Sequence, residues 1–183
     1  MSSIIIIKKL AHLALVALDF FLHKQTPGKC KTEQTDQAET PKTSPNSNLP
    51  RGLRNNNPLN IRHNKDKFQG EVTGTDKSFK TFSCLPYGYR AGFVILHTYL
   101  THGTNTIEKI VSRWSPPCEN DTAKYVEVVE KYSGIPRHKE LTATDGADYI
   151  QIVAVMSFME NGKNADISEV KAGFNLQSKI VMR

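Results

Sequence analysis

The chain has 183 residues, of which 38% are hydrophobic and 8% aromatic. This is enough for one globular domain of ordinary size and excludes a wholly disordered chain. The net charge of +6 suits a polyanionic partner, but no arginine-rich run or zinc-ligand spacing favours DNA, so we expect no nucleic-acid partner.

The first 23 residues predict a signal peptide or signal-anchor. Lys8 and Lys9 precede an apolar run at residues 10–22, which is shorter than the roughly 20 residues that span a bilayer. Asp19 interrupts this run. The alternatives are a membrane-surface helix that makes contact through residues 4–22, and a buried helix of the main domain.

Residues 24–50 predict a disordered linker. They are rich in Thr, Gln, Pro, Ser and Asn and contain almost no large apolar side chain. Such a segment cannot bury enough surface to offset its chain entropy. The folded domain is therefore expected at residues 51–183. The signal segment before it implies a periplasmic or secreted protein.

The domain is predicted to be mainly α-helical, an α+β fold with one small β-hairpin region. A turn-rich segment at residues 51–62 precedes residues 69–82, whose glycines and alternating Phe79 and Phe82 indicate a hairpin or irregular strands. Apolar side chains at helical spacing then predict helices over residues 87–101, 106–114, 121–132, 144–159 and 167–180.

Several residues indicate where these helices begin and end. Thr106 suits an N-cap, and Gly134 follows the helix over residues 121–132. Asn161 and Gly162 predict a left-handed stop. In the helix over residues 87–101, the stripe at helical spacing consists of Ala91, Val94, Ile95, Thr98 and Tyr99.

The three cysteines are too widely spaced for a disulfide framework or a metal site, and we expect no metal and no cofactor. Either all three are free thiols, or Cys84 pairs with Cys118 in an oxidising compartment.

Glu160 is the first candidate for chemistry. The residues before it, "VAVMSFM", are almost wholly apolar, so the last helical turn is expected to be buried. Burial disfavours the charged carboxylate and raises its pKa. A carboxyl group that keeps its proton at neutral pH is the general acid of glycoside hydrolysis. The alternative is an ordinary solvated glutamate at a helix end.

Four segments, "RGLRNNNPLNIR", "GYRAGFVILHTYL", "RWSPPCENDTAKYVEVVEKYSGI" and "FMENGK", together resemble a family of phage virion-associated and prophage proteins with a lysozyme-like, peptidoglycan-degrading domain. The resemblance covers most of the chain from residue 51 to about residue 176. It implies cleavage of a β-1,4 bond of peptidoglycan glycan strands, with Glu160 as general acid and base. Leu59 departs from the glycine expected in "NNNPGNIR".

Flagellar-type glucosaminidases, which are also lysozyme-like, look similar in pieces, but their glutamate helix precedes the motifs that match "NNNPLNIR" and "ENDTAKY". Here the glutamate helix follows them. The resemblance therefore implies a circularly permuted lysozyme-like domain. In that arrangement Glu160, the "RNNNPLNIR" segment and Tyr125 should line one cleft.

Other residues are weaker candidates. Glu119 and Asp76 are the alternatives for a second carboxylate. Amide side chains can bind the acetamido groups of amino sugars, and arginine suits an anionic substrate. The alternatives are structural: asparagines before a proline also suit a loop, and aromatic side chains on a helix stripe usually belong to the core. The substrate-binding candidates are Asn55, Asn57, Asn60, Arg62, Tyr87, Trp114, Asn120 and Tyr125.

The reaction type depends on that second carboxylate. An inverting hydrolase needs one at about 6.5–9.5 Å from the acid, whereas a lytic transglycosylase needs only the acid, because a hydroxyl of the substrate attacks. The weak second acid favours the transglycosylase. The alternative function is a non-catalytic cell-wall-binding or virion structural module of the same fold. We expect a monomer.

Overall fold

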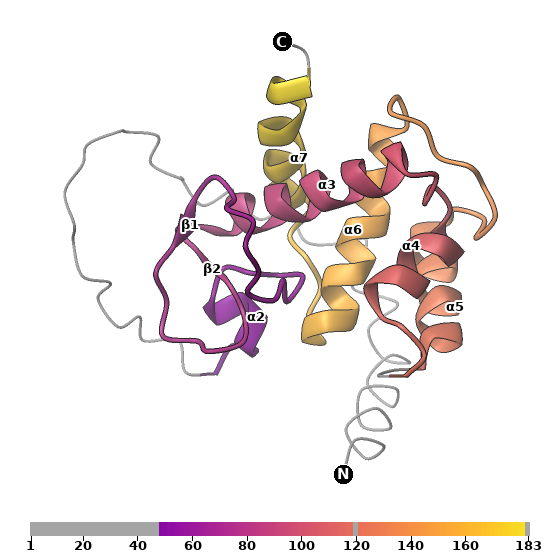
Figure 1. Ribbon diagram of the computed structural model, residues 1–183. Coiled ribbons are helices and arrows are strands. Elements are labelled where there is room, and N and C mark those ends of the chain that lie inside the picture. Colours follow the sequence, from indigo (N-terminus) through magenta and orange to yellow (C-terminus); the bar gives the residue numbers. More distant parts are fainter. Residues whose placement is uncertain (1–47, 119–120, 182–183) are drawn as a thin grey trace.

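The computed structural model describes residues 48–118 and 121–181 (Figure 1). The predicted signal segment at residues 1–23 and almost all of the predicted linker at residues 24–50 lie outside these residues, as do Glu119 and Asn120. Within the described part, none of the helices has the length and apolar character needed to cross a membrane.

The prediction of a mainly helical α+β fold is confirmed. Six helices and one two-stranded sheet are described. In chain order they are α2 (Arg51–Arg54), β1 (Glu71–Val72), β2 (Thr81–Phe82), α3 (Leu85–Thr101), α4 (Ile107–Trp114), α5 (Thr122–Ser133), α6 (Gly146–Asn161) and α7 (Ile167–Val181). Helix α2, a single helical turn, lies in residues 51–62, where the sequence predicted only a turn-rich segment.

The β region is a short antiparallel hairpin. Glu71 pairs with Phe82 and Val72 with Thr81. One further bridge joins Arg62 to Phe79. The hairpin predicted over residues 69–82 is therefore present, but its regular strands are only two residues long, and the rest of this region is held by side-chain hydrogen bonds.

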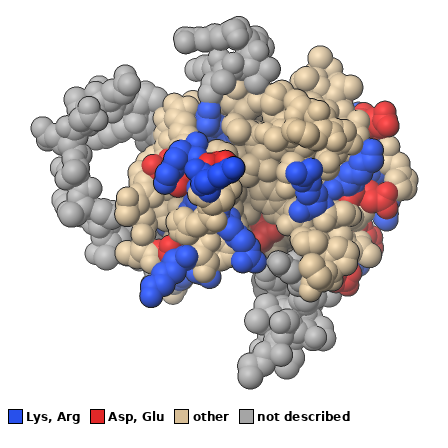
Figure 2. Space-filling model, in the orientation of Figure 1, with Lys and Arg blue, Asp and Glu red and all other residues tan. Residues whose placement is uncertain are grey.

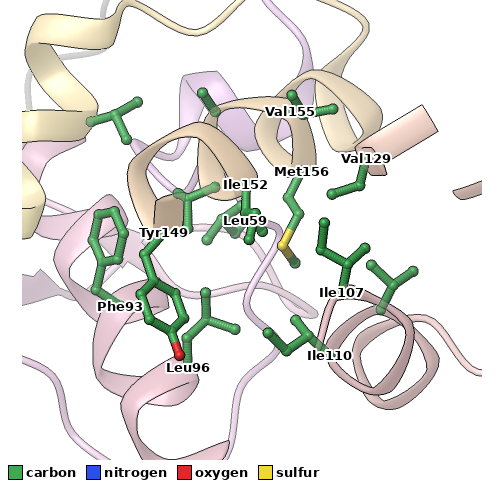
Figure 3. Packing of buried hydrophobic residues seen from close by; sticks show 14 of the residues in the cluster. Leu59, Phe93, Leu96, Ile107, Ile110, Val129, Tyr149, Ile152, Val155 and Met156 are labelled. Atoms are coloured by element: carbon green, nitrogen blue, oxygen red, sulfur yellow. The ribbon is translucent and has the colours of Figure 1, made fainter. Parts of the chain in front are cut away.

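Helix α6 passes through the middle of the molecule, with the β region on one side and α4 and α5 on the other, while α3 crosses it (Figure 1). It is buried on most sides rather than along one stripe, with Ile152, Val153, Ala154 and Met156 fully enclosed. Figure 3 shows Ile152 and Met156 lying among side chains of other elements, including Leu59, Leu96, Ile107 and Ile110.

The predicted ends of the helices are confirmed where local signals were strong. The Thr106 side chain accepts a hydrogen bond from the Lys109 amide at the start of α4. Gly134 and Gly162 both adopt left-handed conformations, with φ of 74° and 66°, after α5 and α6. Gly162 thereby ends α6 immediately after Glu160 and Asn161, which places both of these polar side chains at the end of a buried helix.

Leu59, the departure from the expected glycine, is a core residue. Its side chain is only 1% exposed. It occupies the space next to Gly92 of α3, where an added Cβ would collide with Leu59 Cδ1. The leucine is therefore accommodated because the facing helix has no side chain at this position.

One cysteine pairing is excluded. Cys118 is an exposed free thiol. The pair of Cys84 with Cys118 is therefore not formed. The alternative of three free thiols is also wrong, because Cys84 is disulfide-bonded.

Candidate active site

Glu160 lies at the end of α6 with its side chain partly exposed. One carboxylate oxygen, Oε2, accepts a 2.9 Å hydrogen bond from the Asn60 amide nitrogen. The other, Oε1, accepts a 3.2 Å hydrogen bond from the Tyr125 hydroxyl. The predicted meeting of Glu160 with the "RNNNPLNIR" segment and Tyr125 is thus confirmed, and the carboxyl group is held by two donors that carry no charge.

The loop that presents Asn60 is built around Asn57. The amide nitrogen of Asn57 donates 2.9 Å hydrogen bonds to the carbonyl oxygens of Ile61 and Lys80, and its Oδ1 accepts one from the Ile61 backbone. Asn60 itself has a left-handed backbone with φ of 50°, which asparagine tolerates better than most residues. This conformation aims its side chain at the end of α6.

A second asparagine fastens the end of α6 to the same loop. Asn161 is buried, and its amide nitrogen donates to the carbonyl oxygens of Pro58, at 2.7 Å, and Ser157, at 2.9 Å. Behind this contact lies Gly52 of α2, where an added Cβ would be 2.5 Å from Asn161 Oδ1 and 2.6 Å from Asn60 Oδ1. Only glycine fits there, so α2 supports the asparagines that surround Glu160.

Tyr125 reaches Glu160 from α5 and is only 6% exposed. Its hydroxyl also lies 3.4 Å from the Met156 carbonyl oxygen. Burial raises the pKa of this hydroxyl well above its ordinary value, and the nearby Glu160 carboxylate raises it further. Tyr125 therefore stays protonated and acts as a hydrogen-bond donor to Glu160.

Asp76 belongs to a structural clamp and is no candidate for the second carboxylate. Arg51 donates two 2.6 Å hydrogen bonds to it, and Asn55 donates one of 2.8 Å. The backbone amides of Ser78 and Phe79 donate two more. Its side chain is only 8% exposed, and the Arg51 guanidinium holds the pKa of its carboxyl group far below the usual range.

Three predicted substrate-binding residues also serve the structure. The Asn55 amide nitrogen is taken up by Asp76, and Asn57 is fully buried, so neither side chain is presented to a substrate. Tyr87 lies against Gly70, where an added Cβ would collide with its ring. These assignments depended on tertiary contacts that the local sequence does not contain.

A cavity of about 740 Å³ begins at Asn60 and continues along α3. Trp114 and Arg62, both predicted to bind substrate, line it together with Phe68 and Tyr99. Since Asn60 also bonds to Glu160, the carboxyl group and the cavity share a wall residue.

Part of the predicted stripe of α3 lines this cavity. Val94, Ile95, Thr98 and Tyr99 line it, and Ile95 and Tyr99 also pack against the core, to which α3 contributes Phe93 and Leu96. Arg90, on the same stripe, was missed as a site residue. A charged residue four positions before Val94 was the signal in the sequence that this face of the helix is not wholly core.

Comparison with known proteins gives one informative match. The chain is 42% identical over 130 residues to "Protein P5" of Pseudoalteromonas phage PM2, and the match covers 68% of this chain and 79% of that protein. No family model matches the sequence.

Proposed function

The chain belongs to the family of protein P5 of Pseudoalteromonas phage PM2, and from the geometry of its site we propose that it cleaves peptidoglycan glycan strands at a β-1,4 bond. The observation that carries the proposal is the placement of Glu160, whose carboxyl group lies at the end of a buried helix between Asn60 and Tyr125, and Asn60 also lines a cavity. A phage relative is compatible with a virion-associated protein that opens the bacterial wall.

Glu160 is proposed to act first as an acid. Its carboxyl group gives a proton to the glycosidic oxygen as the bond from this oxygen to the anomeric carbon breaks. Tyr125 cannot take over this role, because its own hydroxyl holds its proton too strongly. Asn60 and Tyr125 instead fix the position of the carboxyl group and stabilise the carboxylate that remains after proton transfer.

In the second step the same carboxylate accepts a proton from the attacking nucleophile. In a transglycosylase this nucleophile is a hydroxyl of the substrate, and no second carboxylate is required. In a hydrolase it is water. Since Asp76 is held in its clamp, we propose the transglycosylase route; Glu119, the other candidate for a second carboxylate, lies outside the described residues.

We propose further that the domain is lysozyme-like and circularly permuted. Three features support this: the central position of α6, the glutamate at its end, and the meeting of that glutamate with a motif 100 residues earlier in the chain. The alternative, a non-catalytic module, drew on the departure at Leu59. That departure is accounted for by packing against Gly92 and leaves the surroundings of Glu160 complete.

The proposal is tested by incubating the full chain with purified, peptide-stripped peptidoglycan and weighing the soluble fragments by mass spectrometry. Fragments with an anhydro end are expected from a transglycosylase, and fragments heavier by one water from a hydrolase. Binding to the walls without release of any fragment would contradict the proposal and identify a binding module.

A further inference from the structure

Arg90 is a buried cation whose Nε has no hydrogen-bond partner among the described residues. The residue lies on α3, is 6% exposed and lines the cavity beside Asn60. The Nε atom itself is buried. Leaving one donor of a buried guanidinium without a partner costs free energy. Because Arg90 also lines the cavity, its guanidinium is suited to bind an anion that enters the cavity.

The surroundings of Arg90 favour a negative ligand with a sugar-like body. Arg62 and Lys67 line the same cavity, so its lining holds three cationic residues and one acidic residue, Asp66; Lys67 also pairs with Glu71 at 3.6 Å. Figure 2 shows Lys and Arg side chains over the β region and over the helices on the other side of this face. Three aromatic residues, Phe68, Tyr99 and Trp114, complete the lining.

We propose that Arg90 binds a carboxylate of the glycan substrate, so that the cavity selects acidic amino-sugar strands over neutral ones. The inference rests on the proposed function and adds to it the substrate class. A planar guanidinium suits this task because it can donate two parallel hydrogen bonds to one carboxylate. The carboxylate can belong to the lactyl group of the sugar or to an attached stem peptide, and the chemistry of recognition is the same.

The test is a binding measurement that does not depend on catalysis. The full chain carrying Glu160→Gln is titrated with a tetrasaccharide of alternating amino sugars whose lactyl carboxyl groups are free, and with the same tetrasaccharide after conversion of these groups to neutral methylamides. Trp114 is the only tryptophan of the chain and lines the cavity, so its fluorescence reports binding directly. A tetrasaccharide that carries the stem peptide forms the third arm.

The acid form is expected to bind about tenfold more tightly than the methylamide form, as the loss of hydrogen bonds between charged groups implies. Arg90→Met should remove this preference, whereas Arg54→Met, which deletes an exposed charge on α2, should keep it. Tighter binding of the stripped acid identifies the lactyl group as the ligand, and tighter binding of the peptide-bearing form identifies the stem.

The inference is overturned if the protein with Arg90 intact binds the acid and the methylamide with equal affinity. This comparison needs no variant at position 90. A preference that persists in a folded Arg90→Met protein overturns the inference as well. Binding of both forms without preference leaves the proposed function in place, whereas binding of neither form counts against the proposed function and this inference together.

Discussion

Asn60 and Glu160 are 100 residues apart in the chain, yet the amide nitrogen of Asn60 lies 2.9 Å from Glu160 Oε2. This contact joins the first motif of the domain to the end of its central helix. It requires the left-handed backbone of Asn60 and the loop that Asn57 holds in place. The position of the candidate acid is therefore determined by two distant segments, and each can be tested separately.

Asn60→Ala should lower the rate of glycan cleavage by about tenfold, since a hydrogen bond to a charged group contributes about 1.5–3 kcal/mol. The variant removes one of the two donors seen on the Glu160 carboxyl group. The rate is measured by release of soluble fragments from purified walls, at equal folded fraction. Asn105→Ala, which removes only a side-chain oxygen that accepts a hydrogen bond from the exposed Lys109 amine, is the control. An unchanged rate for Asn60→Ala would show that this amide does not position the acid.

Tyr125→Phe should also lower the turnover number by about tenfold, because Glu160 Oε1 loses a hydrogen bond. A hydrogen bond to a charged carboxylate is stronger than one between neutral groups. The matched control on the same helix is Tyr132→Phe, which should behave as the wild type. Because the pKa of Tyr125 lies well above its ordinary value, its hydroxyl remains a donor in alkaline solution. The deficit of Tyr125→Phe should therefore persist in mildly alkaline solution; a Tyr125→Phe protein that keeps the wild-type rate would show that this hydroxyl does not position the acid.

Leu59 and Gly92 should behave as a coupled pair in unfolding experiments. Leu59→Ala is expected to lower the free energy of unfolding by about 3 kcal/mol, as for other fully buried leucines. Gly92→Ala should also destabilise the wild type, because the new methyl group meets Leu59 Cδ1. In the Leu59→Ala background, Gly92→Ala should lower the free energy of unfolding by less than it does in the wild type. Strictly additive values from urea denaturation would show that the two residues do not share this space.

Asp76→Asn tests the clamp that closes the β region, and should lower the free energy of unfolding by about 2 kcal/mol at neutral pH. Arg51 lowers the pKa of the Asp76 carboxyl group below its ordinary value of 3.8. A group with a lowered folded-state pKa contributes its full stability above the unfolded value and loses it as the pH falls. The difference between wild type and variant should therefore be constant above about pH 4 and shrink below it. A difference that grows in acid would contradict this assignment.

The sequence predicted the elements that local signals define. The cap at Thr106 and the left-handed glycines at positions 134 and 162 located the start of α4 and the ends of α5 and α6 closely, because these signals act within one helical turn. The pairing of Glu160 with Asn60 and Tyr125 was predicted from the order of the motifs and is present.

The roles of the other asparagines could not be predicted in this way. Asn55 and Asn57 each bond to a partner more than 20 positions away, Asp76 and Lys80 respectively, and nothing in "RNNNPLNIR" distinguishes these structural residues from Asn60. Similarly, periodicity shows that one side of α3 is apolar but not whether a neighbouring element covers it. For this reason the cavity lined by Val94, Ile95 and Tyr99 was not predicted.

The central claim is that Glu160 is the general acid of a glycan-cleaving enzyme, and the most direct measurement compares Glu160→Gln with the wild type in the release of soluble fragments from purified peptidoglycan. Glu127→Gln, an exposed glutamate on α5, is the matched control and should keep full activity. Glutamine preserves the shape of the side chain and removes its transferable proton, so the account predicts a loss of at least about a hundredfold. If a folded Glu160→Gln protein retains more than about a tenth of the wild-type rate, Glu160 is not the acid.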